Sequence, residues 1–165
     1  MAQTKLGENT VNTSGTLPAK GTNAPEFTLT GLDLKDVSLN KFAGKNIVLN
    51  IFPSIDTNVC AASVREFNKL ATSMKDTVVL SISKDLPFAM KRFCGAEGID
   101  KVVLLSDFKN KHFSNTYGVE MVDGAMNGLF ARAVVVIGPD GKVKHTELVP
   151  SIGEEPDYEA ALSVL

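Results

Sequence analysis

Residues 46–60 read NIVLNIFPSIDTNVC. The β-branched apolar run at 47–51 is typical of a buried strand, and Pro53 ends regular strand pairing and begins a loop. Thr57 and Asn58 are favourable N-cap residues, so a helix is expected to begin there with Cys60 in its first turn. A strand, a short loop and a helix in this order are one unit of an α/β fold.

The same pattern continues along the chain. Strand-like apolar runs follow at 77–83, 102–106 and 133–138. Segments of helical length lie near 59–75, 86–97 and 110–117. Because strands alternate with helices, the sequence predicts a mixed sheet with parallel strands at its centre and helices on its flanks.

The two ends of the chain have different patterns. The turn residues GPDG at 138–141 join two strand-like runs and predict an antiparallel hairpin, followed by a closing helix near 157–165. Short segments punctuated by Gly, Asn and Thr in the first 40 residues predict an extra N-terminal β-hairpin and an edge strand.

Length and composition limit the class of protein. The 165 residues fit one domain, and 44% hydrophobic with 22% charged residues is an ordinary globular composition. A net charge of −2 gives no reason to expect nucleic acid as a partner. The sequence shows neither a secretory signal nor an apolar run that could span a membrane, so we expect a cytoplasmic protein. In that compartment cysteines serve redox chemistry or metal binding more often than structural disulfides.

Cys60 is one of two cysteines, and its helix suggests two interpretations. It heads an apolar stripe that continues through Val64, Phe67, Ala71 and Met74, so its thiol is expected to point into the protein. It could be a small core residue, as free cysteines often are. Alternatively, the helix N–H groups and dipole stabilise its thiolate and make it a nucleophile. The local pattern leaves both open.

A resemblance to a known family favours the nucleophile. The spacing Pro53-x-x-x-Thr57-x-x-Cys60, with VREFN at 64–68, resembles the active-site signature of the peroxiredoxins. The resemblance implies a thioredoxin-like fold. It also implies that Pro53 shields the cysteine, that the Thr57 hydroxyl bonds to sulfur and peroxide, and that Cys60 attacks the peroxide.

The second cysteine, Cys94, lies in a predicted helix that begins at Pro87, and by pattern alone it could be a core residue. DLPFAMKRFCGAEGI at 85–99 resembles the second-cysteine segment of the thiol peroxidases, the atypical two-cysteine peroxiredoxins. LSDF at 105–108, ARAV at 131–134 and ELVPSIGEEPDYEAAL at 147–162 extend this resemblance over nearly the whole chain. It implies that Cys94 is the resolving cysteine.

An arginine is the third expected part of the site. Arg65 follows Cys60 on the same helix, but the 3.6-residue period turns it toward another face. Arg132 begins the strand-like run ARAVVVI and could be a strand-end residue that reaches water. By resemblance it is instead the active-site arginine, and its guanidinium would stabilise thiolate and hold peroxide oxygens.

Other polar residues carry less weight. The two histidines, His112 and His145, lie far apart in the sequence and are expected at surface or boundary positions, so a zinc site is not expected. In the connector GAMNG at 124–128, expected to border the site, Asn127 departs from the more apolar segment typical of the resembled family. Four acidic residues are interpreted as turn or cap residues: Asp33, Asp36, Asp56 and Asp107.

The resemblance implies a thiol-specific antioxidant peroxidase. Cys60 would reduce hydrogen peroxide and organic hydroperoxides to water and alcohols, becoming a sulfenic acid that Cys94 resolves as an intramolecular disulfide. Thioredoxin would reduce the disulfide, no metal or other cofactor would be needed, and the chain would form a homodimer. The residues alone also allow a thiol–disulfide oxidoreductase or a redox-sensing binding module. The lack of a CxxC motif disfavours the first of these.

Overall fold

The computed structural model describes residues 1–109 and 111–165. Its strands and helices follow the chain in this order: β1 (Gln3–Leu6), β2 (Asn9–Asn12), β3 (Thr28–Thr30), β4 (Asp36–Ser38), the 3-10 helix η1 (Leu39–Phe42), β5 (Asn46–Ile51), α1 (Asn58–Ala71), β6 (Thr77–Ser83), α2 (Pro87–Glu97), β7 (Val103–Ser106), α3 (His112–Tyr117), β8 (Ala133–Ile137), β9 (Val143–Leu148) and α4 (Tyr158–Leu162). The predicted strands and helices are confirmed. Position 110, where the third predicted helix was expected to begin, lies outside the described residues.

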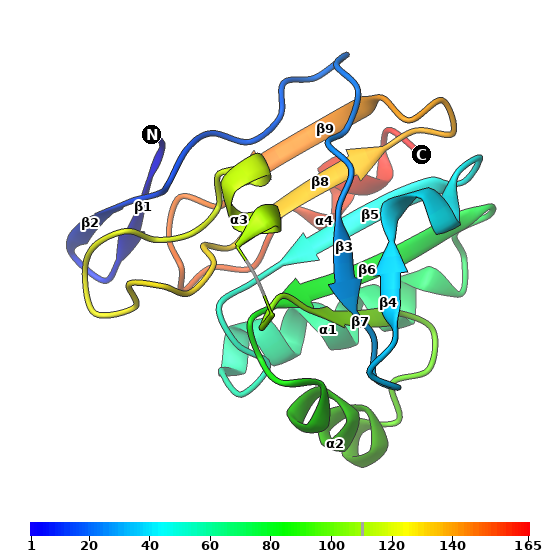
Figure 1. The fold of residues 1–165 in the computed structure, drawn as a ribbon, viewed down its shortest axis with the longest axis horizontal. Coiled ribbons are helices and arrows are strands. Elements are labelled where there is room, and N and C mark those ends of the chain that lie inside the picture. The colour runs from blue at the N-terminus through cyan, green and yellow to red at the C-terminus, as the bar shows by residue number, and fades with distance from the viewer. Residues whose placement is uncertain (110) are drawn as a thin grey trace.

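Seven strands form the main sheet in the order β4-β3-β7-β6-β5-β8-β9 (Figure 1). The three central strands β5, β6 and β7 run parallel, while β8 and β9 continue the sheet antiparallel on one side. The mixed sheet and its parallel centre agree with the expectation from the sequence. The predicted N-terminal hairpin is also present, as the separate two-stranded sheet β1-β2.

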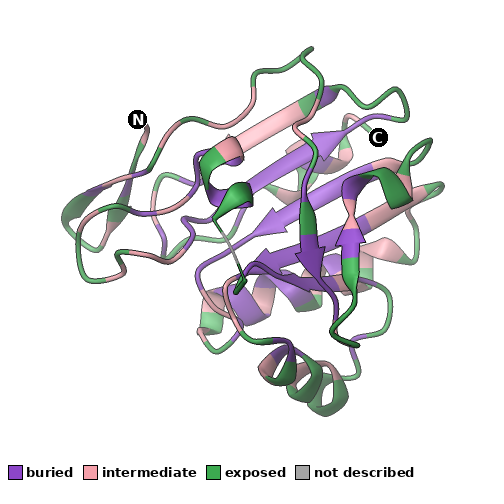
Figure 2. Ribbon diagram, in the orientation of Figure 1, coloured by how far each residue is buried: buried purple, intermediate pink, exposed green. Residues whose placement is uncertain are grey.

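The central strands are buried because helices or loops cover both faces of the sheet. On one face α1, α2 and α4 contribute side chains to a cluster that includes Val48 of β5 and Val134 of β8. On the other face α3 and η1 cover alternate residues of the same strands, such as Leu49 and Val135. Figure 2 shows β5, β6 and β8 buried, whereas α2 is largely exposed. Burial on both faces explains the continuous apolar runs in these strands.

Strand register places two segments that are distant in the sequence at the same end of the sheet, where β5 ends and β8 begins. β5 and β8 pair antiparallel with Ile51 opposite Ala133. The loop that leaves β5 therefore lies beside the residue that enters β8. Ligand sites in open α/β sheets commonly lie at the carboxyl ends of parallel strands, and this end of the sheet has that position. Among the described residues, no helix is long and apolar enough to cross a membrane.

Candidate active site

Cys60 is the third residue of α1. The loop before α1 starts at the carboxyl end of β5, so Cys60 belongs to the end of the sheet described above. Its side chain is 0% exposed and belongs to the core cluster between α1 and the sheet. The N-cap residue of α1 is Thr57, whose side chain makes no capping hydrogen bond. The first N–H groups of a helix have no partner within the helix, so they supply partial positive charge next to the sulfur.

Arg132 directly precedes β8 and meets Cys60 at this end of the sheet. Its Nη2 lies 3.4 Å from Cys60 Sγ. The Ile152 carbonyl accepts hydrogen bonds from Arg132 Nε at 3.1 Å and from Nη2 at 2.8 Å, which fixes the plane of the guanidinium. Arg132 is 1% exposed, so the alternative of a strand-end arginine that reaches water is wrong. Among the described residues, its Nη1 has no hydrogen-bond partner.

A cavity of about 360 Å³ opens beside Arg132, and Cys60 lies behind its wall without lining it. Pro53, Thr57 and Val59 line it from the loop and the first turn of α1, together with Arg132. Other parts of the chain complete the wall: Leu6, Gly7, Asn58, Met126, Ser151, Ile152 and Gly153. The wall is mostly apolar with a few polar groups, as is usual in sites for small organic molecules.

The Thr57 hydroxyl has a different partner from the one that the resemblance implies. It donates to the Ser54 carbonyl at 3.0 Å. A hydroxyl has a single proton, so in this conformation Thr57 does not donate to the sulfur as well. Its oxygen lone pairs can still accept a hydrogen bond from the O–H of a hydroperoxide in the cavity.

A chain of buried polar groups behind Cys60 was missed in the sequence. Ser63 Oγ donates to the Cys60 carbonyl at 2.7 Å, and Asn50 Nδ2 donates to Ser63 Oγ at 3.3 Å. Both side chains are fully buried. The available signal was Asn50 itself, a polar residue inside the apolar run of β5, because buried amides require partners.

Cys94 lies in the last turns of α2, partly buried against the same core cluster as Cys60. Its carbonyl accepts hydrogen bonds from Gly98 N, at the helix C-cap, and from Ile99 N. Burial raises the pKa of the Cys94 thiol, so less of it is thiolate at neutral pH than in an exposed cysteine. Both cysteines are free.

Arg65 faces away from Cys60, as predicted. It forms a two-bond ion pair with Glu97 of α2, with both N–O distances 3.0 Å, and its guanidinium lies 5.8 Å from the centre of the Phe93 ring. The Arg65 side chain is about half exposed, with 48% of its surface accessible. Arg65 therefore links α1 to α2 at the surface and does not enter the cavity.

The interpretation of Asp107 as a turn or cap residue is wrong. Its side chain is only 3% exposed, and among the described residues neither carboxyl oxygen has a hydrogen-bond partner. Burial is the main cause that raises the Asp107 pKa to about 7, with Lys84 lowering it and Glu120 raising it. The Asp107 backbone N–H donates to the Ser83 carbonyl at 2.9 Å, which holds Asp107 between the ends of β6 and β7.

The connector at 124–128 reaches the cavity through Met126, while Asn127 is exposed and is not among the lining residues. His112 is exposed, and its Nε2 lies 3.3 Å from the Glu26 carbonyl, which agrees with a surface position. His145 lies half-buried in β9, a boundary position.

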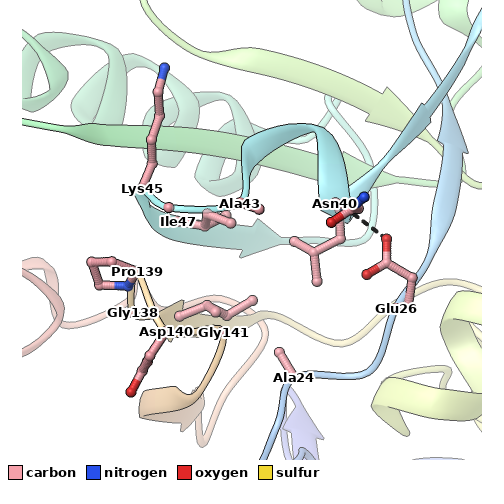
Figure 3. A pocket seen from close by; sticks show the side chains of 13 residues that line it. Ala24, Glu26, Asn40, Ala43, Lys45, Ile47, Gly138, Pro139, Asp140 and Gly141 are labelled. Atoms are coloured by element: carbon pink, nitrogen blue, oxygen red, sulfur yellow. Dashed lines mark hydrogen bonds between the residues drawn. The ribbon is translucent and has the colours of Figure 1, made fainter.

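A second pocket, of about 210 Å³, lies at the opposite end of the sheet (Figure 3). Ile47 and Ile137 line it, at the ends of β5 and β8 remote from Cys60. Glycine-rich turns, including Gly138 and Gly141, form much of its wall. This pocket and the cavity beside Arg132 share no lining residue, so it is separate from the candidate active site.

Comparison with known proteins supplies the family context. The Redoxin family model matches residues 19–162. A thiol peroxidase of Mycobacterium tuberculosis is 58% identical over 165 residues, which cover 100% of this chain and 99% of that protein. The crystal structure of a peroxiredoxin-like protein from Aquifex aeolicus is 36% identical with a TM-score of 0.93, covering 99% of this chain and 96% of the other. A thiol peroxidase from Chromobacterium violaceum, 21% identical, shares the fold with a TM-score of 0.91 over 99% and 95% of the two chains.

Proposed function

The chain belongs to the Redoxin family and, within it, to the thiol peroxidases, and we propose that it reduces hydroperoxides with Cys60 as the nucleophile. The observation that carries this assignment is the 3.4 Å contact between Cys60 Sγ and Arg132 Nη2 beside an apolar cavity. Both groups are buried, so the electrostatic interaction between them is stronger than it would be in water.

The proposed first step is attack of the Cys60 thiolate on one oxygen of the hydroperoxide. The O–O bond breaks, the sulfur takes that oxygen as a sulfenic acid, and the other oxygen leaves as an alkoxide or hydroxide that takes up a proton. Arg132 Nη1, which has no partner among the described residues, is a free donor for the oxygen on which charge develops. Thr57 accepts the peroxide O–H, and Pro53 restricts water.

Cys94 completes the cycle in this proposal. Its thiol condenses with the Cys60 sulfenic acid, which forms an intramolecular disulfide and releases water. A thioredoxin-type dithiol then reduces the disulfide by thiol–disulfide exchange and restores both thiols. Such a reductant requires a reducing compartment, so a cytoplasmic location belongs to the same proposal.

The cavity supports a preference for organic hydroperoxides. Leu6, Val59 and Met126 give it apolar walls that would contact a hydrocarbon group but gain nothing from hydrogen peroxide. Cys60 itself has no exposed surface, so a protein disulfide cannot reach it directly. This disfavours the thiol–disulfide oxidoreductase.

A homodimer is the proposed assembly. Its support is an exposed apolar pair at the start of α2, where Leu86 is 51% and Phe88 is 67% exposed. Sedimentation velocity of the reduced protein should give the mass of two chains, and Phe88→Asp should lower the dimer fraction. A monomer at micromolar concentration would contradict this assembly.

The assay that tests the proposed function follows hydroperoxide-dependent oxidation of thioredoxin. Wild-type protein should turn over, and Cys60→Ser should lose activity to the background rate because serine is a far weaker nucleophile at neutral pH. Cys94→Ser should consume about one equivalent of hydroperoxide per chain and then stop. Turnover by Cys60→Ser would reject the assignment.

A further inference from the structure

The carboxylate of Asp85 accepts three hydrogen bonds from two separate segments. Its Oδ1 accepts from Ser54 Oγ at 2.8 Å. Its Oδ2 accepts from the Ile55 backbone N–H at 2.7 Å and from Ser83 Oγ at 2.6 Å. Hydrogen bonds to an ionised acceptor are among the stronger ones in proteins. Asp85 thus fastens the loop that follows Pro53 to the junction between β6 and α2.

On one side this clamp leads to Cys60. The Ser54 carbonyl accepts from the Thr57 hydroxyl at 3.0 Å and from the Thr57 N–H at 3.2 Å. The Thr57 carbonyl in turn accepts from Ala61 N at 3.0 Å, which closes the first turn of α1. The position of Ser54 therefore fixes the turn that carries Cys60.

On the other side the clamp leads to the helix of Cys94. Asp85 lies two residues before Pro87, the first residue of α2, and Leu86 is the N-cap between them. The Asp85 carbonyl accepts a hydrogen bond from Ser106 Oγ at the end of β7, which anchors the junction to the sheet. One side chain thus holds together the segments that precede both cysteine-bearing helices.

We propose that Asp85 is a positioning residue that holds the loop 54–57 in its peroxide-reactive arrangement and restrains the movement that joins Cys60 to Cys94. The inference rests on the proposed function. Formation of the disulfide requires at least one sulfur to move, because both thiols are free and Cys60 Sγ lies against Arg132. Release of the Ser54 and Ile55 bonds lets the first turn of α1 unwind toward α2.

This arrangement gives the sulfenic acid two competing fates. In one, the Cys94 S–H condenses with Cys60 S–OH, forming the S–S bond and releasing water. In the other, a second hydroperoxide transfers an oxygen to the sulfur, which becomes a sulfinic acid while the alcohol leaves. The first fate needs the clamp open, and the second needs the closed cavity. A looser clamp therefore slows attack on peroxide and protects against over-oxidation.

The test compares wild type with Asp85→Asn. An amide has the same shape but a single acceptor oxygen, so it cannot accept from both Ser54 and the Ile55–Ser83 side. Stopped-flow oxidation of the reduced variant should show a rate constant for cumene hydroperoxide roughly 10-fold lower, the loss expected for a displaced reacting group. During turnover with excess hydroperoxide, mass spectrometry should show several-fold less sulfinic acid at Cys60 per turnover than in wild type.

Two further variants make the result decisive. Asp56→Asn is the matched control, because it removes one negative charge from the same loop. The only ion pair of this exposed carboxylate among the described residues is with the exposed Arg92, at 3.6 Å, and exposed ion pairs contribute little. Both readouts should therefore stay at the wild-type level. Ser54→Ala removes the bond to Asp85 Oδ1, and with it the bond that Ser54 Oγ accepts from the Asp56 N–H at 3.2 Å, but leaves both bonds to Oδ2. It should change both readouts in the same direction by a smaller factor, even if Asp85→Asn fails to fold.

The outcomes separate a clamp from simple structural support. The proposal would be overturned if Asp85→Asn lowered the rate constants of peroxide attack and of disulfide formation equally and left the sulfinic fraction per turnover unchanged. It would also be overturned if Ser54→Ala and Asp85→Asn both behaved like wild type. Cys60→Ser measured in parallel tests the proposed function separately. If that variant loses turnover while the sulfinic fraction is unaffected by Asp85→Asn, only the clamp fails.

Discussion

Arg132 carries a positive charge on a side chain that is only 1% exposed. Its hydrogen-bond acceptors are the neutral Ile152 carbonyl and the Cys60 sulfur, and no ion pair with a carboxylate joins it among the described residues. A buried charge is costly unless it is compensated, and a negative charge on the sulfur would compensate this one. At the scale of single residues, Arg132 is therefore placed to offset negative charge that develops at the sulfur or at a bound oxygen in the proposed reaction.

Arg132→Met should keep the volume of the side chain but remove its donors and charge. We expect kcat/KM for hydroperoxides to fall by about 10²–10³-fold, as when a donor to a developing oxyanion is lost. Steady-state peroxidase kinetics measure the effect. Arg65→Met is the matched control, because Arg65 is on the helix of Cys60 but outside the cavity, and it should retain near wild-type activity. An equal loss in both variants would point to a structural role for Arg132.

Asp107 makes stability depend on pH. Its pKa in the folded protein, about 7, is above the value near ~3.9 of an unfolded chain, so the folded state holds the proton longer as the pH rises. The contribution of Asp107 to the free energy of unfolding is therefore complete below about pH 4 and is lost as the pH rises through about 7. Asp107→Asn mimics the protonated form, so its melting temperature should exceed that of wild type increasingly between pH 4 and 8. Parallel melting curves against pH would contradict this, and exposed Asp100→Asn serves as control.

At the scale of elements, the hairpin β1-β2 supports the site from outside the main sheet. The Lys5 N–H donates to the Pro150 carbonyl at 3.0 Å, and the Lys5 carbonyl accepts from Ile152 N at 2.8 Å. These bonds hold the loop whose Ile152 carbonyl orients Arg132. Leu6, at the end of the same strand, lines the cavity. The hairpin therefore contributes both to the geometry of the guanidinium and to the apolar wall.

Leu6→Asn should change substrate preference more than catalysis. Removing part of an apolar contact costs about 1–1.5 kcal/mol, which corresponds to roughly 10-fold in kcat/KM for cumene hydroperoxide. Hydrogen peroxide has no hydrocarbon group, so its kcat/KM should change by less than about 2-fold on the same reasoning. Leu34→Asn is the control, because Leu34 is exposed and does not line the cavity. Equal losses for both substrates would show that Leu6 supports the fold and does not select the substrate.

At the scale of the whole molecule, the local sequence predicted the strands and helices better than the contacts between them. The strand, loop and helix around Cys60 follow from apolar pattern, Pro53 and Thr57, all close in the chain. The contact between Cys60 and Arg132 depends on the pairing of Ile51 with Ala133, and only family resemblance suggested it. The clamp at Asp85 was missed because the two partners that join it to the loop, Ser54 and Ile55, are 31 and 30 positions away in the chain.

The two cysteine helices should be joined after reaction with hydroperoxide. One equivalent added to the reduced protein should give a disulfide between Cys60 and Cys94 within one chain, since both thiols border the same core cluster. Non-reducing electrophoresis and peptide mapping detect it. A disulfide that links two chains would contradict the resolving role of Cys94 and would require a different assembly.

The central claim is that Cys60 takes the peroxide oxygen. Reduced Cys94→Ser protein, treated with one equivalent of cumene hydroperoxide and then with a sulfenic-acid trapping reagent, isolates the first step. Peptide mass spectrometry should place the trapped oxygenated sulfur at Cys60 in nearly every chain, and the Arg132→Met form of the same protein should react far more slowly. An unmodified Cys60, with the hydroperoxide unconsumed or its oxygen on another residue such as Met126, would contradict the account.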